Sequence, residues 1–245
     1  MEGPGSGTAG SRLRDDPAAK RSGSVKRSFI PAAFGVLVGI AVALPACKTG
    51  REWQQLFNGK DLSGWQHVGE GGMRVENGLI RTYGKGMGLL WWTGGKIGNA
   101  VIRVVYKTQD KVDDSGVFIR IPLEPREAWM PVHYGYEVNI EYDPARWQED
   151  DYYATGSLYS FTKILTKADR PGPEWNTLEI TLDGPRTTVY VNGAKVTDFT
   201  EGDPVPDWRR DDPQRGPRPN EGYIGIQNEG DEAVLFKEIA IKPLH

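Results

Sequence analysis

Residues 135–143 read Gly-Tyr-Glu-Val-Asn-Ile-Glu-Tyr-Asp, and their alternation indicates the fold of this chain. Successive side chains of a strand point to opposite faces. Four apolar or aromatic residues share one face: Tyr136, Val138, Ile140 and Tyr142. Three polar residues share the other: Glu137, Asn139 and Glu141. Such a polar row is stable where it faces water or a ligand. Two interpretations therefore stay open, a solvated sheet face and the floor of a binding cleft.

Other segments also have strand character. The Asn-Gly pairs at 77–78 and 192–193 lie between short alternating runs, which is typical of hairpins with type I′ turns. Five further runs alternate or are rich in β-branched residues: 100–109, 115–121, 176–182, 222–227 and 233–241. We therefore predict an all-β fold, a two-sheet antiparallel sandwich.

Periodicity also predicts the core of this sandwich. Val117 and Ile119 alternate with Phe118 and Arg120, and Val138 and Ile140 alternate with the acidic row. We expect these four aliphatic residues to be buried between the sheets.

Two Pro-rich stretches, 122–131 and 201–220, interrupt the strand pattern. They contain Trp129 and Trp208. Loops of this length often carry function.

The N-terminal region has a different composition. Residues 1–24 are rich in Gly, Ser, Arg and Asp without an apolar period, which predicts a disordered extension. Residues 25–46 contain a basic pair followed by an apolar run, which is typical of a secretory signal peptide. An alternative to the disordered extension is that translation starts near Val25, so that residues 1–24 are not part of the protein. We expect residues 47–245 to form a single β-sandwich domain.

Residues 44–47, Leu-Pro-Ala-Cys, resemble a bacterial lipobox. The resemblance implies that Cys47 is lipidated and becomes the first mature residue. No Asp follows Cys47, so we expect an exported lipoprotein on the periplasmic or cell-surface face of the outer membrane. The alternative is a signal anchor with an incidental thiol.

Charge and residue counts exclude several function classes. Residues 47–245 carry 24 basic and 30 acidic residues, a net charge of −6, and no basic stripe, so nucleic acid is not an expected partner. Three histidines make a His-rich transition-metal site improbable, and no nucleophile elbow, phosphate loop or zinc motif occurs. Asp113–Asp114 is a candidate for a structural Ca²⁺, against the simpler interpretation of two surface acids in a turn.

Nine runs occur together in one order: 56–65 (LFNGKDLSGW), 75–80 (VENGLI), 115–120 (SGVFIR), 135–140 (GYEVNI), 155–159 (TGSLY), 174–179 (EWNTLE), 191–196 (VNGAKV), 222–227 (GYIGIQ) and 236–244 (FKEIAIKPL). Together they resemble the 3-keto-disaccharide hydrolase family. The resemblance implies a jelly roll like that of concanavalin A-like lectins and glucanases, with sugar on the concave face. It also implies hydrolysis of glycosides oxidised to a ketone at C3, beside a partner sugar 3-oxidoreductase. The run 226–229 (IQNE) ends in Glu229 where relatives often have His, so no acid–base or metal role is carried over to that position.

A 3-keto sugar needs particular chemical groups around it. The ketone acidifies the hydrogen on C2, so the site needs a base, an acid for the leaving oxygen, and a cation or donors for the enolate. We assign Glu137 as base or acid, Glu141 as second candidate and Arg120 as the cation. Glu137 and Glu141 lie about 13 Å apart along one strand, too far for an ordinary glycosidase pair. No cofactor is required.

Further residues are candidates for substrate binding. We expect Asn139 to share the polar face with Glu137, His133 to shuttle a proton and Lys163 to reach the cleft rim, although a loop histidine and a solvated lysine have structural explanations. Tryptophan rings suit sugar faces. We place Trp129 in the cleft. Only one of the neighbours Trp91 and Trp92 can face the cleft from a strand, and we choose Trp92. Asn228 and Glu229 complete the set.

Two other functions stay open. A non-catalytic carbohydrate-binding lipoprotein would use the same cleft and aromatic residues. A conventional β-glucanase would need a closer pair of carboxyl groups. The membrane is a partner only through the lipid anchor in each case.

Overall fold

The computed structural model describes residues 52–110, 113–141, 151–170, 172–207, 213–231 and 233–244. The chain divides into two compact units, 1–45 and 46–245, and the described residues belong to the second. The extension, the signal peptide, Cys47 and Trp208 lie outside the described residues. Within the described ranges, no helix is long and apolar enough to cross a membrane.

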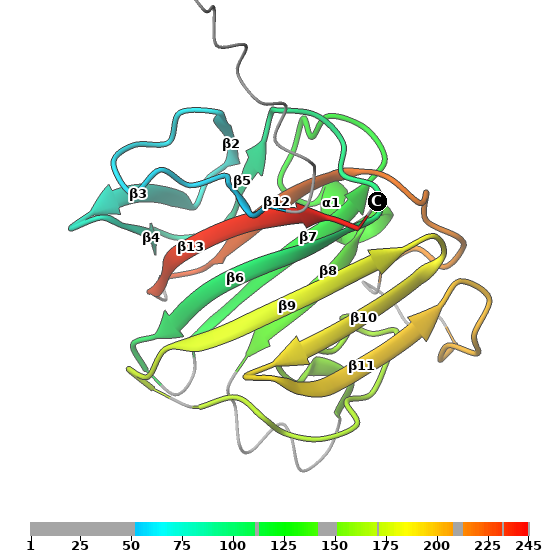
Figure 1. The fold of residues 1–245 in the computed structure, drawn as a ribbon. Coiled ribbons are helices and arrows are strands. Elements are labelled where there is room, and N and C mark those ends of the chain that lie inside the picture. The colour runs from blue at the N-terminus through cyan, green and yellow to red at the C-terminus, as the bar shows by residue number, and fades with distance from the viewer. Residues whose placement is uncertain are drawn as a thin grey trace, which may run out of the picture. The chain divides into compact units, whose positions relative to one another are not determined.

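The described residues form two antiparallel sheets that pack face to face (Figure 1). The larger sheet has, in order, β11 (Ala194–Thr200), β10 (Arg186–Val191), β9 (Asn176–Asp183), β6 (Ala100–Thr108), β13 (Val234–Pro243), β4 (Leu79–Tyr83) and β3 (Gly72–Glu76), with β1 (Gln54–Gln55) paired to β13. The smaller sheet has the order β2 (Trp65–Gly69), β5 (Met87–Trp92), β12 (Tyr223–Glu229), β7 (Asp114–Ile121) and β8 (Tyr136–Glu141). This confirms the predicted all-β antiparallel sandwich.

Both predicted Asn-Gly hairpins are present. Asn77 and Gly78 connect β3 to β4 with φ values of 52° and 78°, and Asn192 and Gly193 connect β10 to β11 with 49° and 83°. Two consecutive positive φ values define a type I′ turn, whose twist matches that of the strands it joins. A further tight turn, at Gly184 with φ 54°, connects β9 to β10 and was not predicted.

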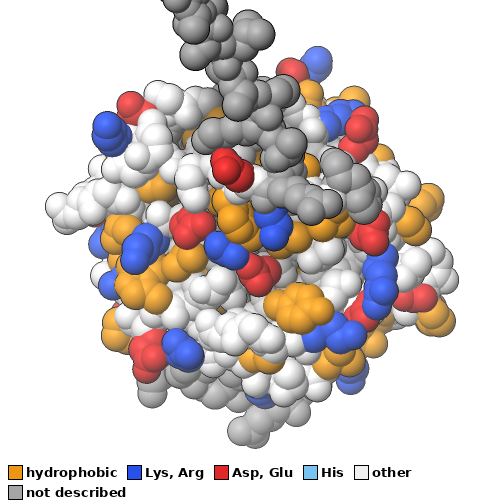
Figure 2. Space-filling model, viewed as in Figure 1, with side chains coloured by type: hydrophobic (Ala, Val, Ile, Leu, Met, Phe, Trp, Pro, Cys, Tyr) orange, Lys and Arg blue, Asp and Glu red, His pale blue; other side chains and the backbone are white. Residues whose placement is uncertain are grey.

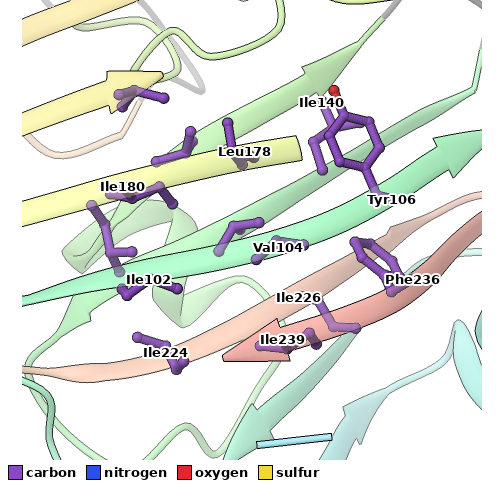
Figure 3. Close-up of a cluster of buried hydrophobic side chains, with 14 of the residues drawn as sticks. Ile102, Val104, Tyr106, Ile140, Leu178, Ile180, Ile224, Ile226, Phe236 and Ile239 are labelled. Carbon is purple, nitrogen blue, oxygen red and sulfur yellow. The ribbon is translucent and has the colours of Figure 1, made fainter. Parts of the chain in front are cut away.

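The core lies between the two sheets. Val117, Ile119, Val138 and Ile140 are each at most 1% exposed, as predicted. Figure 3 shows side chains of β6, β9 and β13 meeting those of β8 and β12 in this layer. Alternation within each strand therefore gives the smaller sheet an apolar inner face. Its outer face carries the second set of side chains, which includes the polar row of β8.

Part of that outer face is covered by the segment 122–134. Its Pro-rich loop leads into a short helix, α1 (Met130–Tyr134), which the sequence did not predict and which has Pro131 in its first turn. Ala128 and Val132 of this segment pack with Phe118 of β7 in a second apolar cluster. The segment thus covers part of the outer face, and α1 packs against β7 and β8.

The outer face of the larger sheet is polar. Basic and acidic side chains are interspersed over it (Figure 2). Arg103, for example, contacts Glu179 at 2.9 Å and Glu238 at 3.9 Å. Partly exposed pairs of this kind contribute little to stability, but they keep this face solvated.

Two adjacent residues of β6 test the two-layer packing. Val104 is fully buried, whereas Val105 on the opposite face is partly exposed. Val104→Ala should lower the free energy of unfolding by about 2–3 kcal/mol, since it removes two buried methyl groups and leaves a cavity. Val105→Ala should lower the free energy of unfolding, measured by urea titration, by less than half as much. Equal losses would contradict the assignment of faces.

Candidate functional site

A cleft of about 170 Å³ lies on the smaller sheet's outer face, beside the segment 122–134. Eight described residues line it: Asp114, Trp129, Val132, Glu137, Asn139, Tyr159, Gln227 and Glu229. Three are carboxylic acids, two are amides and none is Lys, Arg or His. The cleft therefore disfavours anionic ligands, and its carboxyl and amide groups can exchange hydrogen bonds with the hydroxyl groups of a neutral one.

Glu137 lies at the floor of this cleft and is 5% exposed. Its carboxyl group rests over Gly116 of β7, where a Cβ atom would lie 2.7 Å from Glu137 Cγ and 2.9 Å from Cδ. Gly116 is the register partner of Asn139, the next residue of β8 that faces the cleft. The missing side chain at position 116 thus provides the space that Glu137 occupies.

The surroundings of Glu137 change its acidity. Burial raises its pKa well above the usual range, and the negative charges of Glu229 and Glu141 raise it further. A hydrogen bond with Gln227 acts in the opposite direction. Glu137 is therefore a carboxylic acid that keeps its proton above the pH at which an ordinary glutamate loses it.

Residues 154–160 pair with the edge of β8 that faces away from β7. Asn139 N donates to Ser157 O at 3.0 Å, and Tyr159 N donates to Glu137 O at 2.9 Å. This pairing brings Tyr159 to the cleft wall. Asn139 Nδ2 donates to Tyr153 O and to Glu141 Oε2, the latter at 3.3 Å, so the amide itself is held by its neighbours.

The opposite wall comes from β12. Gln227 and Glu229 line the cleft, and Gln227 is 2% exposed. Gln227 Oε1 has no hydrogen-bond partner in the described part of the chain, which leaves it available to a ligand hydroxyl. Asn228, which we predicted for the site, does not line the cleft. Its Nδ2 donates to Gly86 O at 3.0 Å and Gly230 O at 3.2 Å, so it ties two turns together.

Trp129 lies at the mouth of the cleft with 52% of its surface exposed, where the sequence placed it. The placement of Trp92 in the cleft is wrong: it packs edge-to-face on Trp65 with ring centroids 5.5 Å apart, beside the inter-sheet core. Trp91 is the one that points to the outer face. It is 3% exposed and packs with Tyr223 in the outer apolar cluster, so it does not line the cleft.

The prediction that Arg120 shares a cleft with Glu137 is also wrong. Arg120 has φ 54°, and the pairing of β7 with β12 shifts register beside it. This bulge changes the alternation, so Ile121 joins Phe118 in the outer cluster.

The Arg120 side chain is completely buried. Its guanidinium donates to three backbone oxygens, those of Pro219 at 2.9 Å, Gly184 at 2.7 Å and Arg186 at 3.2 Å. Gly184 and Arg186 belong to the turn and the strand of the larger sheet. Arg120 therefore joins the two layers and does not contact the cleft.

Three other predicted site residues lie outside the cleft lining. His133 is in α1, where its carbonyl oxygen accepts from Arg218 at 3.2 Å. Lys163 is exposed and lies 5.2 Å from the ring centre of Tyr152. Glu141 is buried and acts on the site through its charge.

The acidic pair 113–114 has two separate roles. Asp113 accepts from the backbone amides of Gln109 and Asp110, the latter at 2.8 Å, and so caps a turn. Asp114 lines the cleft. In the described ranges, no group of three or more His, Cys, Asp or Glu side chains is arranged to hold a metal ion. Bound Ca²⁺ stays a prediction.

Sequence reasoning missed Asp114, Gly116, Tyr159 and Gln227. Asp114 and Gly116 continue the alternation of Phe118 towards the start of β7, which was a usable signal. Gln227 and Tyr159 belong to the runs 222–227 and 155–159. Whether their side chains reach the cleft depends on which strands lie beside these runs, which the sequence does not show.

Comparison with solved structures agrees with this architecture. Two proteins of Parabacteroides distasonis, each provisionally named a glycosyl hydrolase, superpose with TM-scores of 0.65 and 0.63. They share 23% and 24% identity over 79% of this chain and over 100% and 94% of their own. A Bacillus subtilis protein of unknown function with a galectin-like fold has a TM-score of 0.57 at 10% identity, over 78% of this chain and 94% of its own. These likenesses confirm the lectin-type jelly roll.

A search among curated proteins found no match to the chain. The model of a 3-keto-alpha-glucoside-1,2-lyase-like domain matches residues 52–242, almost all of the part that the structure describes. The order of the nine sequence runs, the two-sheet fold and this match agree, and the chain belongs to the 3-keto-disaccharide hydrolase family.

Proposed function

We propose that the protein cleaves neutral glycosides whose sugar ring carries a ketone at C3. The observation that supports this best is the buried Glu137 carboxyl, which lies at the floor of an acidic cleft and has a raised pKa. Family membership supports the 3-keto sugar as substrate class. Such a substrate must be supplied by an enzyme that oxidises the C3 hydroxyl, so a sugar 3-oxidoreductase is the expected partner.

The reaction proceeds by elimination and hydration. A base takes the proton on C2, which the adjacent ketone acidifies, and the electron pair forms an enolate. The enolate re-forms the ketone and a C1–C2 double bond as the C1–oxygen bond breaks, and the leaving oxygen takes a proton from an acid. Water then adds its hydroxyl to C1 and a proton to C2. The net change is hydrolysis.

The cleft offers two carboxyl groups for these proton transfers. Glu137 keeps its proton to a higher pH than usual, which suits donation to the leaving oxygen. Glu229 lines the cleft and is more exposed, which suits the role of base at C2. The negative charge of Glu229 raises the pKa of Glu137, which helps Glu137 to keep its proton.

A second candidate function is sugar binding without turnover. None of the eight described residues that line the cleft is cationic, so the enolate would depend on amide or hydroxyl donors for stabilisation. Trp129 at the mouth would still serve a binding protein, since tryptophan rings pack well on sugar faces.

Replacement of Glu137 separates these two functions. Glu137→Gln should lower kcat for a 3-keto-glucoside by about 10²–10⁴-fold, because the proton donor is lost. Glu141→Gln should lower kcat by a smaller factor, since Glu141 does not line the cleft. Release of the aglycone is the readout. Near-full turnover by Glu137→Gln would refute the assignment, and a wild-type protein that binds sugar without turnover would favour the binding function.

Gly116→Ala provides a second variant that leaves every carboxyl group in place. The new Cβ atom would displace the Glu137 carboxyl from its position over β7. Turnover should therefore fall although the chemistry of the side chain is unchanged. Unaltered turnover would show that the position of the carboxyl over Gly116 is unimportant.

The raised pKa of Glu137 also makes stability depend on pH. Below about pH 4 the folded and unfolded states both carry the proton. As the pH rises, the unfolded state ionises first, so folding loses stability until the pH passes the raised folded pKa. Glu137→Gln cannot ionise, so its Tm should rise relative to the wild-type Tm between pH 4 and 7.5.

Asp198 provides a control of opposite sign. Its pKa is lowered, chiefly by hydrogen bonds from Arg186 and Lys195 at 2.7 and 2.8 Å. The stability that it contributes is present above the ordinary pKa of Asp and is lost in acid. Between pH 4 and 7.5 the Tm of Asp198→Asn should therefore lie below the wild-type Tm by a nearly constant difference, and this difference should shrink only below about pH 4. A pH-independent Tm difference for Glu137→Gln would contradict the buried acid.

We further propose that the protein is exported and anchored by a lipid on Cys47, which rests on the lipobox resemblance of residues 44–47. In a bacterial host, Cys47→Ser should move the protein from the membrane fraction to the soluble fraction. A variant that stays with the membranes would refute lipidation as the anchor.

A further inference from the structure

A second hollow adjoins the cleft. It is a groove of about 560 Å³ on the far side of Trp129, which lines both spaces. Met87 lines the groove and is the register partner of Glu229, which lines the cleft. Opposite residues of paired strands have Cβ atoms about 4.5–5.5 Å apart. The two spaces therefore meet at Trp129 and at the Met87–Glu229 pair.

The sizes of the two spaces differ in a way that fits a two-part substrate. Binding pockets for drug-sized molecules usually measure about 300–1,000 Å³. The cleft, at about 170 Å³, is below that range and has room for only a part of such a ligand. The remainder of a larger glycoside must extend beyond the cleft, and the groove that shares Trp129 is the adjoining space.

The lining of the groove suits a hydroxyl-rich group. Glu70, Arg126 and Glu127 bring three charged side chains to it, and half of the Trp129 surface is exposed. Arg126 is exposed, and no hydrogen bond or ion pair joins its guanidinium to another side chain in the described part of the chain, so its donors are available. A flat ring beside charged donors and acceptors is a combination that binds sugars, since their faces are apolar and their edges are polar.

We propose that this groove is the leaving-group subsite and that it holds a sugar residue, with Arg126 donating to its hydroxyls and Trp129 as the wall shared with the reacting ring. The inference rests on the proposed function, because it concerns the group released from C1. The scissile bond would then cross the junction at Glu229, beside the groups assigned to the proton transfers.

The test compares two substrates in the full chain. One is a 3-keto-disaccharide, and the other is the methyl 3-keto-glycoside of the same ring, which places no sugar in the groove. Arg126→Ala should lower the ratio of their kcat/KM values, disaccharide over methyl glycoside, about tenfold, as expected for loss of a charged hydrogen bond. Lys96→Ala is the matched control. Lys96 is an exposed cation near Tyr223. It lines another hollow, which Arg126 also lines but which shares no residue with the cleft, so it tests whether the effect of Arg126 arises in that hollow.

The outcomes separate this inference from the proposed function. An unchanged ratio in Arg126→Ala, or an equal fall in Lys96→Ala, would overturn the subsite. If the wild-type protein turns over neither substrate, the proposed function fails, and calorimetry with the unoxidised disaccharide and monosaccharide decides the subsite alone. Arg126→Ala should then weaken binding of the disaccharide about tenfold more than that of the monosaccharide. Equal effects on both sugars would refute the groove assignment.

Discussion

The position of the Glu137 carboxyl over Gly116 is the contact on which the cleft depends. Strand β7 lies between β8 and β12, and a side chain at position 116 would separate the groups that those two strands contribute. Without that side chain, Glu137 of β8 comes close enough to Gln227 and Glu229 of β12 for a hydrogen bond and a charge interaction to affect its pKa. The absence of a side chain at Gly116 thus allows residues of β7, β8 and β12 to form one site.

Burial of this acid has a thermodynamic cost. A buried carboxyl favours its neutral form, because the low-dielectric surroundings solvate the charge poorly. The neighbouring acids increase this preference, and the apolar inner layer of the same sheet offsets the cost by hydrophobic burial. The site and the core are therefore the two faces of the same strands.

Arginine has a structural use in this fold. Arg120 donates to backbone oxygens of the larger sheet and of Pro219, and Arg218 donates to Gly135, Gly216, His133 and Gln214 oxygens. Charge-assisted hydrogen bonds of this kind satisfy a buried guanidinium without a carboxylate at every donor. They connect the segments before β12 to the helix and to β8. Arg120, which we assigned as the cation for the enolate, instead joins the two layers.

Much of the fold followed from the sequence by itself. The Asn-Gly turns, the antiparallel sandwich, the buried Val117, Ile119, Val138 and Ile140, and the polar row of β8 were all predicted, because turn conformation and side-chain alternation are local properties. The tertiary structure decided the rest of the site. The bulge at Arg120 reversed the expected face of that side chain, and the order of β8, β7 and β12 brought Gln227, Glu229 and Asp114 beside Glu137. The pKa of Glu137 depends on Gln227 and Glu229, which are about 90 residues away in the chain. The groove beside Trp129 likewise depends on strands that come earlier in the chain. Periodicity assigns a residue to a face of its own strand, but it does not say which strand lies next to it or where a bulge changes the alternation.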